Sequence, residues 1–161
     1  MLKGFVDAYT ALNDKKCLEI ALQNGQFIID TLWSSEGNLW HSYKNQKSTI
    51  NGYLEDYALV IAAFIRLYEV TFDEQWLHHS KKLIDYSLVH FYDSKTGFFR
   101  FTSDLDEALI ATHFETEDNV IPASNSVMGK NLFLLSIYFE NREYEKISRQ
   151  MVQNILPTIS Y

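Results

Sequence analysis

The 161-residue sequence is poor in cysteine, proline and glycine, with one Cys, two Pro and six Gly. The single cysteine, Cys17, excludes an internal disulfide framework and is typical of proteins from a reducing compartment, so we expect a cytoplasmic protein. Scarce proline and glycine leave few helix breakers, which favours long helices joined by short connections.

Positive charge and long apolar runs are also scarce. Lys and Arg number 14 against 21 Asp and Glu, for a formal net charge of −7. This balance argues against a nucleic-acid partner and against an anionic membrane, because both require a basic surface. The longest apolar run is far shorter than the roughly 18–20 residues that span a bilayer. The N-terminus does not resemble a cleavable signal, so we expect no membrane association.

Apolar residues make up 47% of the sequence and aromatic residues 15%. That is enough for one domain with a substantial core over residues 1–161. The stretch 58–65 has no polar residue and predicts a helix that is buried on all sides. Glu55 and Asp56 come just before it. Because a buried charge is costly unless it is paired or beside a wet cavity, we expect this helix to begin at a cleft.

Hydrophobic periodicity predicts six helices, over residues 2–12, 16–33, a buried helix ending near 71, 74–92, 124–140 and 142–155. Pro122 and Ser124 are typical of a helix start, with Ser124 as a capping residue. Residues 39–43 and 98–102 read as short strands, 44–50 as a polar loop, and 103–119 as a long irregular connection. Connections of that length in compact domains are often functional.

A repeat is visible in the helices. Tyr9, Tyr68 and Tyr138 are spaced by 59 and 70 residues, and an amphipathic helix follows each of the more apolar helices that contain them. Alternation of inner apolar and outer amphipathic helices predicts an all-α fold, an α/α-hairpin array of about three hairpins with short β-hairpin-like strands in its loops.

Four stretches of the sequence resemble one family. They are Gly-Tyr-Leu-Glu-Asp-Tyr-Ala at 52–58, the segments 67–77 and 92–99, and Asp-Asn-Val-Ile-Pro-Ala-Ser-Asn-Ser at 118–126. They resemble the spermatogenesis-associated thioredoxin-like proteins and their bacterial relatives, over most of the chain from about residue 30 to 135. The resemblance implies part of an α/α toroid similar to six-hairpin glycosidases and sugar epimerases.

The resemblance also implies what this chain lacks. In that family a thioredoxin-like domain precedes the toroid, and its cysteine motif is absent here, so redox chemistry does not carry over. Three hairpins stand where a full toroid has six. We therefore expect a C-terminal fragment of a longer protein, or a truncated relative, whose exposed hairpin flank self-associates or receives a missing segment. The thioredoxin-like domain of the parent protein is an expected partner.

In α/α toroids, the resemblance implies, the ligand cleft lies where the inner helices begin. Glu55, Asp56 and Asp118 are the candidate catalytic carboxylates for acid–base work on a sugar. Adjacent residues on a helix point about 100° apart, so Asp56 with Asp118 is a better pair than Asp56 with Glu55. The alternative is that Glu55 caps its own helix and Asp56 bonds a loop amide.

Candidate ligand-binding residues are the aromatic and polar side chains of the same region, namely Trp40, His41, Tyr43, Tyr53, Tyr57, His113, Asn119, Ser124 and Asn125. His41 and His113 are candidate proton-transfer bases, because imidazole titrates near neutrality; exposed or structural histidines are the alternative. The spacing of the histidines matches no metal motif, and no glycine-rich phosphate loop occurs. We expect no metal and no cofactor.

Two functions stay open. One is a non-catalytic helical domain of a thioredoxin-domain-containing protein, with a vestigial or actual carbohydrate-type cleft. The other is a sugar-processing enzyme domain, similar to a glycoside hydrolase or a sugar epimerase, that uses the cleft carboxylates. A carbohydrate ligand is the expected small molecule in both.

Overall fold

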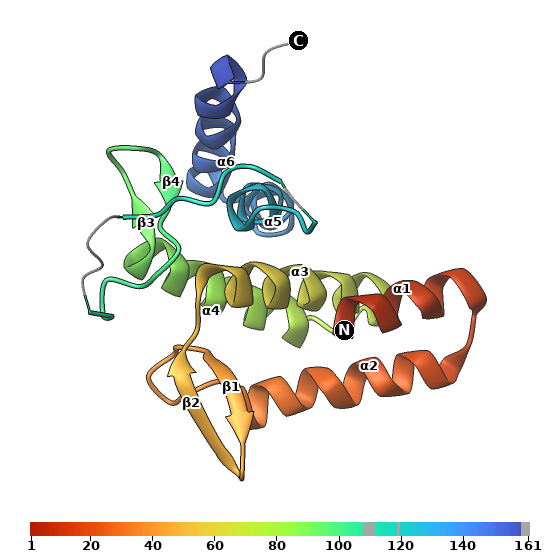
Figure 1. Ribbon diagram of the computed structural model, residues 1–161. Helices are drawn as coiled ribbons and strands as arrows, with labels where there is room; N and C mark the ends of the chain where they lie inside the picture. The colour runs from red at the N-terminus through yellow and green to blue at the C-terminus, as the bar shows by residue number, and fades with distance from the viewer. Residues whose placement is uncertain (108–111, 119, 159–161) are drawn as a thin grey trace.

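The computed structural model describes residues 1–107, 112–118 and 120–158. Figure 1 shows the elements, which are α1 (Leu2–Leu12), α2 (Lys15–Phe27), the π-helical turn η1 (Ile28–Leu32), β1 (Trp40–Lys44), β2 (Lys47–Asn51), α3 (Leu54–Thr71), α4 (Gln75–His90), β3 (Tyr92–Asp93), β4 (Phe98–Phe99), α5 (Ser124–Tyr138), α6 (Arg142–Ile155) and the short 3-10 helix η2 (Leu156–Thr158). The six predicted helices are confirmed.

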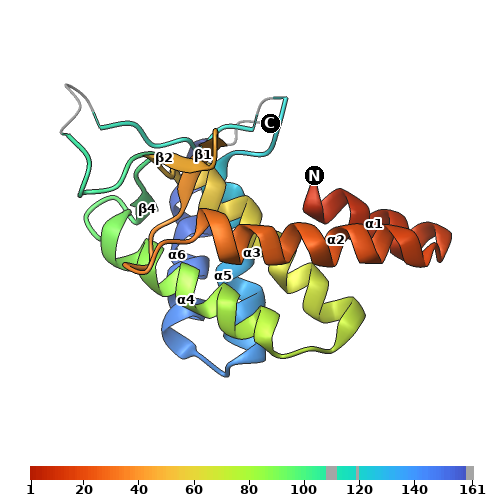
Figure 2. The same cartoon turned by 90° about the horizontal axis from the view of Figure 1, so that it is seen from below.

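Consecutive helices pair into three hairpins, α1 with α2, α3 with α4 and α5 with α6. Helix α3 also packs against α1 and α5, so these three form an inner layer and α2, α4 and α6 an outer one. Figure 1 shows α2 returning beneath α1, and Figure 2 shows α3 between the first and last hairpins. The predicted all-α hairpin array is confirmed.

The same turn closes each hairpin. A residue in the left-handed region is followed by an Asp or Asn whose side-chain oxygen accepts a hydrogen bond from the backbone N–H two residues further on, in the pairs Asn13–Asp14, Phe72–Asp73 and Glu140–Asn141. These turns are 59 and 68 residues apart. The spacing of 70 residues between Tyr68 and Tyr138 is therefore wrong as a repeat length by two residues. Within the repeated hairpin, Tyr138 is equivalent to Val70 and not to Tyr68.

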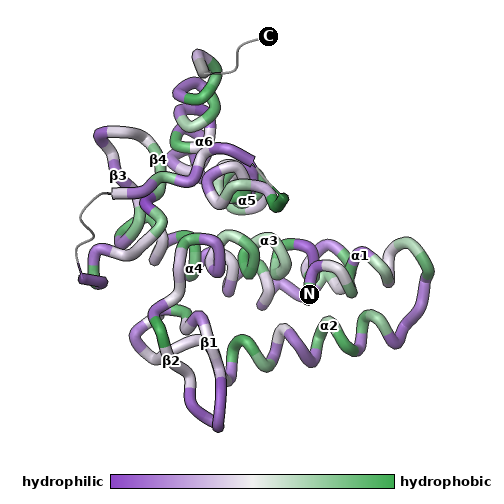
Figure 3. Tube along the Cα trace, in the orientation of Figure 1, coloured by the Kyte–Doolittle hydropathy of each residue, from purple (hydrophilic) through white to green (hydrophobic). Residues whose placement is uncertain are grey.

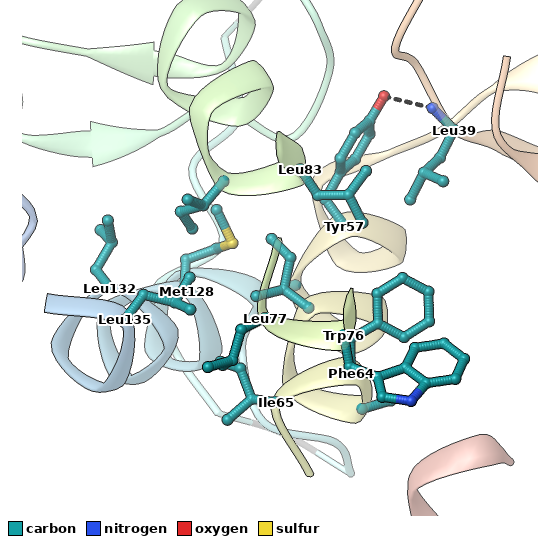
Figure 4. Close-up of a cluster of buried hydrophobic side chains, with 14 of the residues drawn as sticks. Leu39, Tyr57, Phe64, Ile65, Trp76, Leu77, Leu83, Met128, Leu132 and Leu135 are labelled. Atoms are coloured by element: carbon teal, nitrogen blue, oxygen red, sulfur yellow. Dashed lines mark hydrogen bonds between the residues drawn. The ribbon is translucent and has the colours of Figure 1, made fainter. Parts of the chain in front are cut away.

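The core lies on α3 and on the helices around it. Figure 4 shows Phe64 of α3 beside Trp76 of α4, with Met128 of α5 completing the cluster. Figure 3 draws much of α3 in the green of apolar residues. The prediction that this helix is buried on all sides is wrong, since Leu59 is 49% exposed on the face that neither α4 nor the neighbouring inner helices cover.

Two small antiparallel sheets lie before α3 and after α4. In the first, Trp40 lies opposite Asn51, and the two turn residues Asn45 and Gln46 both have positive φ, as a tight hairpin turn requires. In the second, Tyr92 lies opposite Phe99. Strand β2 falls in the segment predicted as a loop, because its polar residues show no apolar alternation. In the described part of the chain, no helix is both long and apolar enough to cross a membrane.

Candidate functional site

The beginnings of α3 and α5 lie at the same end of the molecule. The backbone N–H of Leu54, at the start of α3, donates to the carbonyl of Phe101 at 2.9 Å, and the N–H of Phe101 donates to the carbonyl of His113 at 2.9 Å. The N–H of Asn125 in α5 donates to the carbonyl of Glu115 at 3.4 Å. Segment 112–118 thus joins the two helix starts.

Four rings form a row across this end, which we call the aromatic row: His41, Tyr53, Phe101 and His113. The Tyr53 and Phe101 rings stack with centroids 5.0 Å apart and planes inclined by 14°. His41 meets Tyr53 edge-on at 5.0 Å, and His113 meets Phe101 edge-on at 5.9 Å. Both histidines are exposed and the two stacked rings are half-buried, so the row brings two imidazoles to the surface.

Asp56 connects the aromatic row to α3. Its Oδ2 atom lies 2.9 Å from Nδ1 of His41 and also accepts a hydrogen bond from the backbone N–H of Tyr53 at 2.9 Å. The carboxylate therefore caps the helix and orients the imidazole at once. Nε2 of His41 has no hydrogen-bond partner among the residues that the structure describes, which leaves it available to a ligand.

Glu55 takes no part in this capping. It is half-buried and makes no hydrogen bond or ion pair with the described residues. Helical spacing places it on the same face as Leu59 and Arg66, and these two line a cavity of about 740 Å³ between α1, α3 and α5. The expectation that Glu55 caps its own helix is therefore wrong, because Asp56 occupies that role.

At the start of α5, polar side chains bind backbone groups. Asp118 accepts a hydrogen bond from the N–H of Ala123 at 2.8 Å, and Glu115 accepts one from the N–H of Ser124 at 3.0 Å. The predicted capping by Ser124 is wrong, since the helix begins at that residue and its Oγ is buried with no partner among described residues. Glu115 had no signal in the sequence, because an isolated acid in an irregular connection has no periodicity.

The Asn125 side chain joins α5 to strand β4. Its Oδ1 accepts from the N–H of Phe99 at 2.8 Å, while its Nδ2 donates to the carbonyls of Phe99 at 2.9 Å and Glu115 at 3.0 Å. Asn125 is only 3% exposed. Its amide is thus fully used within the protein.

The other candidates lie apart from the aromatic row or outside the described residues. Tyr57 is fully buried against Tyr86, its hydroxyl accepts a hydrogen bond from the N–H of Leu39 at 2.8 Å, and burial raises its pKa well above the ordinary range. Trp40 is half-buried, and the exposed Tyr43 packs edge-on against Phe27. Asn119 lies outside the described residues. Within residues 1–107, 112–118 and 120–158, no group of three His, Cys, Asp or Glu side chains is placed to hold a metal.

Comparison with known sequences supports the resemblance seen in the motifs. No family model matches the chain. It is 29% identical over 145 residues to spermatogenesis-associated protein 20 of Rattus norvegicus, which covers 84% of this chain and 18% of that protein. The Mus musculus protein is 27% identical over 154 residues, covering 89% of this chain and 20% of its own length. The chain spans about a fifth of the length of these curated relatives, and the predicted resemblance is confirmed.

Comparison with solved structures supports the fold. Cellobiose 2-epimerase from Bacillus thermoamylovorans superposes with a TM-score of 0.75 at 16% identity, over 94% of this chain and 41% of that chain. D-mannose isomerase superposes with a TM-score of 0.77 at 17% identity, over 96% of this chain and 39% of that chain. The three hairpins therefore have the architecture of part of an α/α toroid, as predicted.

Proposed function

We propose that this chain is a non-catalytic segment of an α/α toroid, part of a longer thioredoxin-domain-containing protein similar to spermatogenesis-associated protein 20. In this role, the polar residues at the inner-helix starts brace the loops. The observation that carries the proposal is the use of these side chains: Asp56, Glu115, Asp118 and Asn125 each bind a backbone N–H. The single cysteine supports a cytoplasmic location for such a protein.

Substitution of the two bracing aspartates tests this role. Asp56→Ala and Asp118→Ala each leave a helix-start N–H without its acceptor, and each should lower the free energy of unfolding by about 1–2 kcal/mol in urea denaturation. Glu55→Ala is the matched control, because Glu55 has no partner in the described structure, and it should stay within about 0.5 kcal/mol of the wild type. Aspartate variants that unfold like the wild type would remove the support for bracing.

A second candidate function is binding and processing of a sugar at the aromatic row. The observation that favours it is His41, whose Nδ1 is held by Asp56 while its Nε2 is open beside the Tyr53 ring. Aromatic faces suit the apolar faces of sugars. Removal of a proton next to a sugar carbonyl requires a base that titrates near neutrality, which imidazole supplies. The structural neighbours, an epimerase and an isomerase, act on such sugars by name.

Titration with cellobiose and with D-mannose distinguishes the two functions. If the aromatic row binds sugar, a saturating sugar raises the melting temperature, and His41→Gln removes that rise without unfolding the protein. Tyr43→Ser is the control, because this exposed tyrosine lies in the same strand but outside the row. No rise with either sugar rejects the second candidate and leaves the first standing.

A further inference from the structure

The register of the β1–β2 hairpin places Ile50 opposite His41. The pairs on either side of this position are Trp40–Asn51 and Ser42–Thr49. Because these flanking pairs hold the two strands together, the Cα atoms of the residues between them lie about 5 Å apart. Ile50 is therefore a neighbour, on the adjacent strand, of the imidazole that Asp56 holds.

Ile50 has a backbone conformation that its own side chain disfavours. Its φ is 64°, in the left-handed region. Any residue with a Cβ incurs a cost there, and for a β-branched residue such a value is an outlier. Asn45 and Gln46 also have positive φ, but they form the tight turn of the hairpin, whereas Ile50 lies inside strand β2. The strain at Ile50 is therefore not a requirement of the hairpin turn.

The residue after Ile50 shows how the strained backbone is held. The Asn51 side chain donates from Nδ2 to Asp106 at 2.9 Å and accepts at Oδ1 from Nδ2 of Asn38 at 3.2 Å. These bonds fix the path of the chain as it leaves the hairpin for α3, and the chain turns at Ile50. Glycine or asparagine would make the same turn at lower cost. The path thus explains the conformation of residue 50 but not its isoleucine side chain.

Burial does not explain this side chain either. Ile50 is 53% exposed, so it contributes little to the core. The side chain of His41, across the ladder, is also 37% exposed, and its Nε2 has no hydrogen-bond partner among the described residues. Strained residues that their surroundings hold in place are concentrated at binding sites. An exposed aliphatic side chain held at a cost beside an open imidazole therefore indicates a ligand contact.

We propose that Ile50 is a ligand-contacting residue of the sugar site at the aromatic row, where its side chain packs against the C–H groups of a sugar ring bound at His41. The inference rests on the second candidate function. Sugar rings carry C–H groups on their faces and hydroxyl groups at their edges, so an aliphatic side chain and an imidazole on adjacent strands complement one ring. Binding removes the Ile50 side chain from water, which offsets the cost of its left-handed backbone.

Calorimetric titration of Ile50 variants with cellobiose and with D-mannose tests the contact. Asparagine tolerates the left-handed region, so Ile50→Asn should melt at the wild-type temperature or above it. It should nevertheless raise the dissociation constant of the sugar by about fivefold or more, because the apolar contact is lost. Ile50→Val keeps most of the apolar side chain and should bind with an affinity between those of Ile50→Asn and the wild type. Phe72→Asn is the matched control, since it makes the same kind of exchange at a left-handed residue beyond the other end of α3, and it should leave the dissociation constant unchanged.

The outcomes separate this contact from the function on which it rests. A wild type that binds neither sugar rejects the second candidate function and the contact together. A wild type that binds sugar, with Ile50→Asn binding equally well, keeps the sugar site and overturns the contact. Equal weakening in Phe72→Asn also overturns it, because the loss would then follow from relief of strain at any position. If Ile50→Asn does not fold, binding by Ile50→Val that equals wild-type binding overturns the contact.

Discussion

His79 on α4 is a half-buried titratable side chain packed against aromatic rings. Its ring lies 5.3 Å from that of Trp33 and 6.1 Å from that of Phe64, and its Nδ1 is buried with no hydrogen-bond partner among described residues. Burial, followed by the charge of Lys82, lowers its pKa below 6.5. The folded protein therefore prefers the neutral imidazole.

This preference predicts a pH dependence of stability. As pH falls, the unfolded chain binds a proton at His79 before the folded chain does. The contribution of the neutral ring to the free energy of unfolding is therefore complete above pH 6.5 and is lost progressively below it. His79→Phe keeps the aromatic packing and removes the titration. The free energy of unfolding of this variant, measured in urea, should fall less steeply than that of the wild type between about pH 7 and 5.

The neighbouring histidine provides the control for this measurement. His78 is exposed, and its charge comes after burial and Lys82 among the causes that lower the pKa of His79, so His78→Gln should keep most of the pH dependence of the wild type. If the free energy of unfolding falls with pH equally steeply in His79→Phe and in the wild type, His79 does not cause this pH dependence.

Single residues were the hardest part of the candidate site to predict. The sequence marks Glu55, Asp56 and Asp118 as polar residues beside apolar helices, which is enough to propose a site there. It does not show that Asp56 holds His41, because that contact crosses 15 residues and depends on how β1 folds back over the start of α3. Asn125 likewise appears as a ligand candidate, although its amide is used by Phe99 and Glu115.

Among the elements, the three turns that close the hairpins differ in how well their sequences suit them. Asn13 and Phe72 both adopt a left-handed conformation, with φ of 53° and 56°. Asparagine tolerates this region, whereas other residues with a Cβ incur a cost of about 1–2 kcal/mol. Phe72 is also 78% exposed, so its ring contributes little burial in return.

Exchange of these two residue types tests the cost. Phe72→Asn should raise the free energy of unfolding by about 0.5–1 kcal/mol, because it relieves backbone strain. Asn13→Phe, at the equivalent turn, should lower it by a similar amount. Both are measured by urea denaturation. A loss of stability in Phe72→Asn would mean that the edge-on contact of Phe72 with Tyr68 outweighs the strain.

The junction of α5 with β4 depends on one buried amide. Asn125→Ala removes three hydrogen bonds and leaves the N–H of Phe99 without its acceptor, so we expect a loss of about 2–4 kcal/mol in the free energy of unfolding. Ser126→Ala is the matched control in the same helical turn, because Ser126 is exposed, and it should change stability by less than about 0.5 kcal/mol. Equal small effects in both variants would contradict a bracing role for Asn125.

Helices were more predictable than strands in this chain. Apolar periodicity gives the bounds of α1 and α6 to the residue, because each has a clear inward stripe and a capping residue. Strand β2 has no such pattern, since Lys47, Ser48 and Thr49 are held mainly by backbone pairing with β1. The end of α2 was also missed, because the sequence does not signal that its last turn becomes π-helical at Ile28.

Across the whole molecule, charged side chains join the first hairpin to the second. Arg66 of α3 donates from Nε to Asp7 of α1 at 3.0 Å and pairs with Glu69 at 2.8 Å, while Lys3 approaches Asp7 at 2.7 Å. Burial alone would raise the pKa of Asp7, but the hydrogen bonds from Lys3 and Arg66 outweigh it and hold that pKa below 3.8.

The consequence for stability follows from the lowered pKa. The contribution of ionised Asp7 to the free energy of unfolding is present above pH 3.8 and is lost as pH falls through the lower pKa that Asp7 has in the folded state. Asp7→Asn should lower the free energy of unfolding near neutrality by about 0.5–1 kcal/mol, since the pair is partly exposed, and should make the loss of stability in acid less steep. Asp30 is an exposed acid on η1, and Asp30→Asn is the control, which should lose stability in acid as steeply as the wild type. If Asp7→Asn loses stability in acid as steeply as the wild type, other carboxylates set the acid dependence of stability.

The recurrence of one turn at each of the three hairpins has an evolutionary consequence. Each unit carries its own closing signal, and its contacts with other units are mostly with the units directly before and after it. An array of this kind can gain or lose a whole unit at either end by duplication or deletion of a gene segment, and the units that remain keep the rules by which they stack. Related chains of very different length can therefore share this architecture without sharing the chemistry of any one site.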